Sequence, residues 1–281
     1  MHAPAEQANI AALETALLLE AVFQRFGHDY RAHDQATIAR KLRVLMEARA
    51  LGTVSALQEQ VLHSDGVAQQ LLRALAVEPE GPFDDPAFVR ELRSVLAASL
   101  HASPLPKIWL AECGAATEAW ALAIVLAEQQ LDARAEIYAT VADEARLLEM
   151  REATVPEHAV VQWHHLYRQG GGSGNLAEFF EFADGRARLR AQLRAQLRAR
   201  IVWFHYSLVT DASFNEFQAI VCSSILPTLG PAMRQRALGL FHDSLARFGV
   251  LAIDGQLLPG DAHAHCYQAI GAQRNWYKRV A

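Results

Sequence analysis

The feature that most constrains the fold is the alternation of short apolar runs with helical segments in the later part of the chain. A helical segment from Glu118 to Gln130 follows the first run. The β-like runs are KIWLA (107–111), AEIYAT (135–140), RIVWFH (200–205), QAIVCS (218–223) and GVLAID (249–254). Strands that alternate with helices in this way form parallel sheets with crossover helices. The pattern therefore predicts an α/β domain built on a parallel sheet.

The N-terminal part has a different pattern, with apolar residues at helical spacing and short turns between the segments. Leu13, Leu17, Val22 and Phe26 recur along the first segment and predict one buried helix face. Three further helices are expected through TIARKLRVLMEAR (37–49), SALQEQVLH (55–63) and VAQQLLRALAV (67–77). We therefore predict a helical N-terminal domain at 1–77, a Pro- and Gly-bearing junction at 78–86, and an α/β domain at 87–281.

Two segments between the second and third β-like runs are unusual. The glycine run GGGSG (170–174) neither follows a strand nor opens a helix, so we interpret it as a flexible turn rather than a phosphate-binding loop. The repeat RARLRAQLRAQLRAR (186–200) places leucines at a spacing of four residues among arginines. It predicts an amphipathic helix with a solvated basic face, and a surface for an anionic partner is the alternative.

Composition excludes several classes of protein. With 281 residues, 52% hydrophobic residues and a formal net charge of -5, the chain is neither disordered nor basic enough to have nucleic acid as its main partner. No apolar run is long enough to span a bilayer, so we expect a cytoplasmic protein without membrane insertion. The three cysteines form no CxxC pair, and HAHC (263–266) has no second ligand pair with suitable spacing, so no metal site is predicted.

Several phrases, in order along nearly the whole chain, resemble one family. They are LLLEAVFQRFGHDYR (17–31), KIWLAEC (107–113) with EAWALAIVLAE (118–128), and IVWFHYSLVTDASFNEFQAIVC (201–222). They resemble the CheR-type methyltransferases of bacterial chemosensory systems, which transfer a methyl group from S-adenosylmethionine to glutamate side chains on chemoreceptors. The resemblance implies a small N-terminal helical bundle, then a Rossmann-like methyltransferase domain with a small inserted subdomain at about 155–200.

The resemblance also implies which positions would contact the cofactor. They lie at the junction, in the first strand-to-helix turn, at the end of the second strand and in two later phrases. The positions are Glu78, Glu80, Asp84, Glu112, Gly114, Ala116, Glu118, Val141, Ser207, Leu208, Ser224 and Ile225.

Most of these positions depart from the family pattern. The family has a Gly-Cys-x-Thr-Gly-Glu-Glu type turn where this chain has ECGAATE (112–118), so both glycines that allow close backbone approach are replaced. Where the family has an acidic residue that accepts hydrogen bonds from the ribose, this chain has Val141. The family's cofactor-contacting arginine at the junction has no counterpart in this chain. We therefore expect no catalytic residue and no bound cofactor, or S-adenosylmethionine if the site still functions.

These observations lead to two main hypotheses for the function. The first is a degenerate CheR-like (pseudo)methyltransferase that serves as a binding or regulatory module in bacterial chemosensory or two-component signalling. Its partner would be a chemoreceptor or another signalling protein. The alternative is an active S-adenosylmethionine-dependent protein-glutamate O-methyltransferase acting on chemoreceptors, and a pocket altered to hold another ligand is a third possibility. Arg40, Lys41 and Arg43 match the family's receptor-facing basic helix, with an ordinary solvated surface as the alternative.

Overall fold

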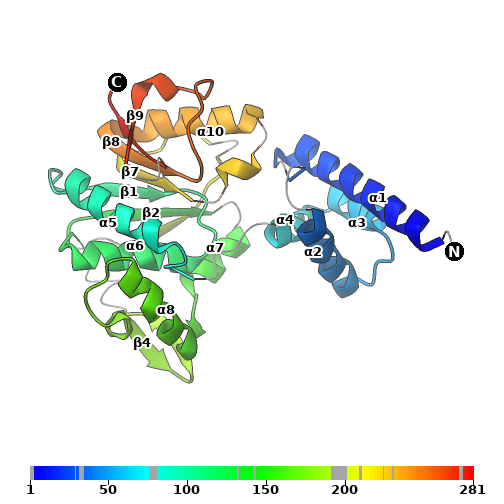
Figure 1. Cartoon of the computed structure of the whole chain (residues 1–281), viewed down its shortest axis with the longest axis horizontal. Coiled ribbons are helices and arrows are strands. Elements are labelled where there is room, and N and C mark those ends of the chain that lie inside the picture. Colours follow the sequence, from blue (N-terminus) through cyan, green and yellow to red (C-terminus); the bar gives the residue numbers. More distant parts are fainter. Residues whose placement is uncertain are drawn as a thin grey trace. The chain divides into compact units, whose positions relative to one another are not determined.

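The computed structural model describes most of the chain (Figure 1). The described residues are 3–28, 30–31, 35–75, 81–131, 133–141, 144–190, 201–208, 211–223, 225–229, 231–271 and 275–281. Three of the predicted cofactor positions, Glu78, Glu80 and Ser224, lie outside them, as does most of the arginine repeat. The chain divides into two compact units, Met1–Val77 with Pro227–Met233, and Glu78–Leu226 with Arg234–Ala281.

The N-terminal unit is helical, as the sequence predicts. Its helices are α1 (Ala3–Phe26), α2 (Gln35–Ala48), α3 (Val54–His63) and α4 (Asp65–Leu75). The predicted buried face of α1 is confirmed for Val22, which is fully buried, but it is wrong for Leu13 and Leu17, which are 61% and 52% exposed. Leu18, which the prediction left out, is fully buried. Apolar residues occupy more than one side of this helix, so spacing alone could not select the side that packs against α3.

The second unit contains a seven-stranded sheet, which confirms the predicted α/β class. The strands lie in the order β6-β2-β1-β7-β8-β10-β9. Neighbours from β6 to β8 are parallel, while β10 runs antiparallel to both β8 and β9. The strands are β1 (Lys107–Leu110), β2 (Glu136–Val141), β6 (Ile201–His205), β7 (Phe217–Cys222), β8 (Leu245–Ile253), β9 (Tyr267–Ile270) and β10 (Trp276–Arg279).

Helices lie on both faces of this sheet (Figure 1). Side chains of β1 alternate between the faces, so Ile108 and Leu110 join a large apolar cluster with α5 and α6, while the Trp109 ring packs against Phe217 and Phe241. Each of these side chains is buried. The helices of this unit are α5 (Pro86–Leu100), α6 (Ala116–Glu128), α7 (Glu144–Arg151), α8 (Glu157–Gln169) and, from Arg234 onward, α10 (Pro231–Ser244).

The inserted region forms a small antiparallel sheet in the order β3-β5-β4. Its strands are β3 (Val155–Pro156), β4 (Phe180–Ala183) and β5 (Arg186–Leu189). The start of the arginine repeat is therefore a strand and not the predicted helix, with Leu189 buried and paired with Phe180. The alternating burial of β5 explains the difference, since Ala187 and Leu189 point into the core and the arginines point outward. The repeat's residues 191–200 lie outside the described part of the chain.

The glycine run forms the turn that follows α8. A Cβ atom on Gly172 would lie 2.3 Å from the Tyr167 ring, and Gly171 has a φ of +88°. Arg93 donates to the Gly170 carbonyl over 2.9 Å, and the Gly174 amide donates to the Tyr167 hydroxyl over 3.2 Å. The glycines thus let the backbone turn tightly against an aromatic ring.

Candidate functional site at the carboxyl edge of the sheet

The topology places a switch point between β1 and β7. From β1 the chain continues to β2 on one side, whereas β7 lies on the other side of β1. Open parallel sheets bind ligands in the crevice at the carboxyl ends of the strands at such a point. The turn from β1 into α6 (residues 111–115) and the ends of β2 and β7 border this edge, and they include several of the predicted cofactor positions.

The backbone of the turn has a conformation that favours glycine. Glu112 has a φ of +52°, in the left-handed region that costs a side chain with Cβ about 1–2 kcal/mol. Hydrogen bonds to β2 hold it there, since the Cys113 amide donates to the Thr140 carbonyl over 2.8 Å and the Glu112 amide to Thr140 Oγ1 over 3.3 Å. The turn therefore keeps a conformation that suits glycine, although a glutamate occupies it.

The carboxylate of Glu118 is used within the protein. One oxygen accepts from the Ala115 amide over 3.0 Å, which caps the start of α6, and the other accepts from the Ser223 hydroxyl over 2.8 Å. Burial raises the pKa of Glu118, while these hydrogen bonds and the charge of Arg146 act in the opposite direction. Both oxygens of this predicted cofactor position already have partners in the protein.

A guanidinium covers the turn from the side of α7. Arg146 donates to the carbonyl of Gly114, and its guanidinium lies 3.9 Å from the Glu149 carboxylate in the next turn of the helix. The Cys113 thiol, beneath the turn, donates to the Ala115 carbonyl over 3.0 Å. Burial raises the pKa of Cys113 well above its ordinary value, so the thiol stays protonated. On the side facing α7 the turn therefore already has a cation of the protein bonded to its backbone.

The end of β2 is apolar and sealed. Val141 is 1% exposed, belongs to the apolar cluster under α6, and accepts the Tyr206 amide at its carbonyl over 3.0 Å. Its neighbour Thr140 is fully buried, and its hydroxyl accepts from Trp109 Nε1 over 3.0 Å. A valine side chain cannot accept a hydrogen bond from a ribose hydroxyl, and the hydroxyl of the adjacent Thr140 already bonds Trp109.

The predicted positions after β6 and β7 lie near the same edge. The Ser207 amide donates to the Asp211 carboxylate over 2.9 Å, and Leu208 is buried. Ile225 follows β7 and is half-buried. Burial and then the nearby Glu112 carboxylate raise the pKa of the Cys222 thiol, which places the charge of Glu112 close to the end of β7.

The remaining residues of the turn and junction have structural roles. Ala116 is buried at the start of α6, and the Gly114 carbonyl is the acceptor for the arginine described above. Asp84 accepts the Gly81 amide and closes a tight turn before α5. A Cβ on Gly81 would lie 2.3 Å from the Trp163 indole, so this turn also depends on a glycine.

The predicted basic face lies on α2 in the N-terminal unit. Arg40 and Arg43 are exposed, one turn apart. Lys41 points to the other side of the helix, where its ammonium donates to the Leu75 carbonyl at the end of α4 over 3.2 Å. The outward part of the face is therefore the arginine pair. Among the helices in the described residues, none is long and apolar enough to cross a membrane.

Two families of known domains match this chain. The family described as "CheR methyltransferase, all-alpha domain" matches residues 13–76, and "CheR methyltransferase, SAM binding domain" matches residues 83–256. The protein Cher3 of Pseudomonas putida (strain KT2440) is 32% identical over 241 residues, which cover 86% of this chain and 87% of Cher3.

Solved methyltransferase structures are more remote. Magnesium protoporphyrin IX methyltransferase from Synechocystis PCC 6803 is 12% identical with a TM-score of 0.37, covering 95% of this chain and 94% of the enzyme. The 1,6-didemethyltoxoflavin-N1-methyltransferase of Burkholderia thailandensis is 14% identical with a TM-score of 0.38, covering 79% of this chain and 89% of the enzyme.

Proposed function

Because this chain belongs to the CheR methyltransferase family, we propose that it is a degenerate member that serves as a protein-binding or regulatory module in bacterial signalling. The family binds S-adenosylmethionine, and this chain retains its helical and α/β domains. In our proposal the protein acts in the cytoplasm, residues 1–77 recognise the partner, and residues 87–281 retain the fold without productive cofactor binding.

The observation that carries this proposal is the mutual pairing of polar groups at the β1–α6 turn. Glu118 bonds the Ala115 amide and the Ser223 hydroxyl, while Arg146 covers the Gly114 carbonyl. Methyl transfer is an in-line displacement that depends mainly on holding donor and acceptor in position. A cofactor entering here would have to replace these internal bonds, and Val141 would leave a ribose hydroxyl unpaired at a cost of about 1–3 kcal/mol.

One observation favours the alternative, an active protein-glutamate methyltransferase. Glu112 and Glu118 place two carboxylates beside the turn, and the sulfonium and amine of the cofactor are both positively charged. The attraction of these charges could offset part of the loss, because opposite charges interact more strongly away from bulk water. The two functions therefore differ in a measurable quantity, the affinity for the cofactor.

Calorimetric titration of S-adenosylmethionine and S-adenosylhomocysteine into the full-length protein tests the proposal. We expect no saturable heat at micromolar ligand, and an active CheR-family enzyme under the same conditions serves as the positive control. Saturable binding to the wild-type protein would overturn the proposal and support the alternative.

A matched pair of variants shows which change is responsible. Arg146→Ala removes the cation over the turn, and Arg151→Ala removes another α7 arginine, which instead donates to the Trp203 carbonyl over 3.1 Å. We expect both variants to remain unable to bind, because the departures from the family pattern lie at several separate positions. Binding gained only by Arg146→Ala would show that a single side chain blocks an otherwise competent site.

The partner in this proposal is a chemoreceptor or another signalling protein with an acidic surface. Exposed Arg40 and Arg43 supply long-range attraction that weakens as salt screens it. We expect capture of such partners to fall when both are changed to glutamate. The control changes exposed Arg90 and Lys278, in the other unit, to glutamate. An equal loss of capture in both double variants would show that the net charge of the protein, and not the arginine pair, attracts the partner. Unchanged capture by the first double variant would show that Arg40 and Arg43 do not contribute to partner binding.

A further inference from the structure

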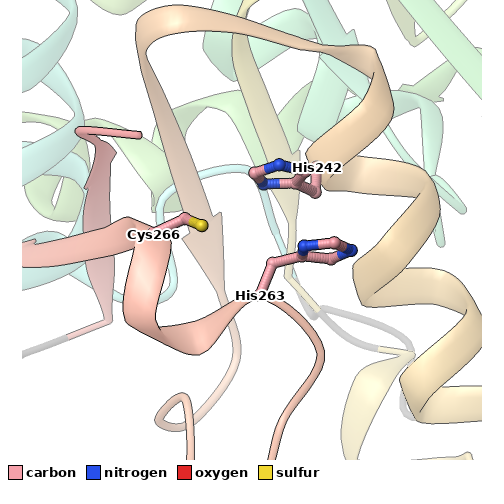
Figure 2. A group of neighbouring side chains, drawn as sticks. All are labelled: His242, His263 and Cys266. Atoms are coloured by element: carbon pink, nitrogen blue, oxygen red, sulfur yellow. The ribbon is translucent and has the colours of Figure 1, made fainter.

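A group of metal-ligand side chains lies in the C-terminal part of the α/β unit, separate from the β1–α6 turn. Figure 2 shows the imidazole rings of His242 and His263 stacked on each other, with the sulfur of Cys266 beside them. One ligand atom from each residue lies within 4.8 Å of the other two. We propose that these three residues form a binding site for a borderline transition-metal ion, with Zn²⁺ the ion whose ligand preferences they match.

The three residues come from two elements that are distant in sequence. His242 lies in the last turn of α10, whereas His263 and Cys266 are three residues apart around the short 3-10 helix η3 (Ala264–Cys266), which leads into β9. His263 has a φ of +56°, and its carbonyl accepts the Cys266 amide over 2.8 Å. This tight turn places both side chains of the second element toward the end of α10.

Hydrogen bonds near the C-terminus hold the two elements in place. Arg279 donates to the His242 carbonyl over 2.8 Å, and the Val280 amide donates to the Cys266 carbonyl over 2.8 Å. The last residue of β10 and the residue after it therefore bond the backbone of one ligand in each element. A site whose supporting backbone is already fixed loses less freedom when it binds an ion.

The polar atoms in this group are incompletely paired, in contrast to those of the turn. His242 is only 9% exposed, and its Nδ1 atom is buried without a hydrogen-bond partner. Leaving a buried polar atom unpaired is costly, and such atoms call for an explanation such as an ion. Cys266 is buried and free, so its sulfur is available as a thiolate ligand. Two imidazoles and a thiolate are the donor types that zinc takes.

Binding requires one movement, and the structure indicates which ring makes it. The two imidazoles are parallel, with centroids 4.0 Å apart and an angle of 4° between the planes, so their lone pairs do not converge. His242 is confined between His263 and the edge of the Tyr267 ring, at 5.8 Å. His263 is exposed and can rotate, bringing the donors to the separations of about 3.3–3.6 Å that tetrahedral zinc requires.

Binding of the ion releases one proton from the protein. The Cys266 thiol gives its proton to solvent as its sulfur bonds the ion, and each imidazole donates a lone pair from an unprotonated nitrogen. A water molecule would complete a four-coordinate site. The oxidation state of the ion does not change.

Cobalt titration of the metal-free, tag-free, full-length protein tests the site directly. Co²⁺ is expected to produce thiolate-to-cobalt charge-transfer absorption in the near ultraviolet that saturates at about one equivalent and disappears when Zn²⁺ is added. Cys266→Ser should abolish this absorption, and His263→Ala should weaken binding at least about tenfold, since loss of a supporting residue alone costs 10- to 100-fold.

His265→Ala is the matched control, because His265 is an exposed histidine within the same HAHC stretch but outside the cluster. It should bind cobalt as the wild type does. Equal circular dichroism melting curves of the metal-free variants establish that each is folded, and His242→Gln supplies a further ligand variant of similar size. Absence of charge transfer in the wild type would overturn the proposal, and so would equal binding by His263→Ala and His265→Ala.

Discussion

The β1–α6 turn and the His242/His263/Cys266 cluster differ in whether their polar side-chain atoms have hydrogen-bond partners. At the turn, Glu118 and Arg146 bond partners within the protein, although the topology places a ligand crevice there. At the cluster, ligand-type side chains gather where no cofactor site is expected, and the buried Nδ1 atom of His242 has no partner. The comparison teaches that topology indicates where a ligand is expected to bind, whereas the pairing of individual atoms indicates which polar groups there are still available to it.

The largest effect is expected from a change beneath the turn. Trp109 is fully buried among aromatic rings that include Phe217 and Phe241, and its indole donates to Thr140, the hydroxyl that also accepts the Glu112 amide. Trp109→Ala should lower the free energy of unfolding by about 3–5 kcal/mol, measured by urea denaturation. Trp109→Phe should cost less because it keeps most of the ring. A loss below about 1 kcal/mol for the alanine variant would mean that the Trp109 ring contributes little to the core beneath the turn.

The second effect concerns the cluster. Zinc at 100 times its dissociation constant should raise the free energy of unfolding by about 2.7 kcal/mol, and chelation should reverse this gain. Thermal unfolding with and without zinc measures the change. Cys266→Ser should lose the gain, while Cys113→Ser at the turn should keep it. If zinc changed the free energy of unfolding equally in the two serine variants, the gain could not be assigned to the cluster.

A smaller effect should depend on pH at the turn. Burial raises the pKa of Glu118 in the folded protein above the ordinary value of 4.5. At pH values between the unfolded-state pKa and the raised folded-state pKa, the folded protein therefore binds more protons than the unfolded chain. This contribution to stability is complete below about pH 4.5 and is lost as the pH rises through the raised pKa. Glu118→Gln should remove this dependence, as measured by denaturation midpoints over a pH series, with Glu149→Gln as the exposed α7 control. An unchanged slope would show that Glu118 is not the group that titrates.

The smallest effect tests the backbone of the turn. Glu112→Gly should relieve a left-handed conformation worth about 1–2 kcal/mol and lose about 0.5–1 kcal/mol through the greater freedom of glycine in the unfolded chain, a net gain of about 0.5–1 kcal/mol. Gln130, after α6, has a φ of +58° and provides the matched control. Gln130→Gly should be stabilised by a similar amount in urea denaturation. If only Glu112→Gly gained stability, relief of charge crowding near Cys222 would be the better explanation.

The sequence predicted the α/β class and the N-terminal helices because these depend on periodicity within single segments. KIWLA and QAIVCS are apolar runs of strand length, and both form adjacent strands of the sheet. It failed where several arrangements suit one local pattern. Leu17 and Leu18 are equally apolar, yet only contacts with other helices decide that Leu18 is buried. The segment from Arg186 to Leu189 suits a helix or a strand, and pairing with β4 decides it.

Some features of the candidate sites could likewise be predicted from the sequence, and others could not. The resemblance to the CheR family is enough to predict that the turn lacks two glycines of the family pattern and that Val141 stands where the family has an acidic residue, because this comparison needs only residue types in order along the chain. The bond from Arg146 to the turn and the meeting of His242 with His263 and Cys266 could not be predicted from the sequence. The physical reason is that residue type and spacing act along the chain, whereas the convergence of donors and acceptors depends on how distant elements pack.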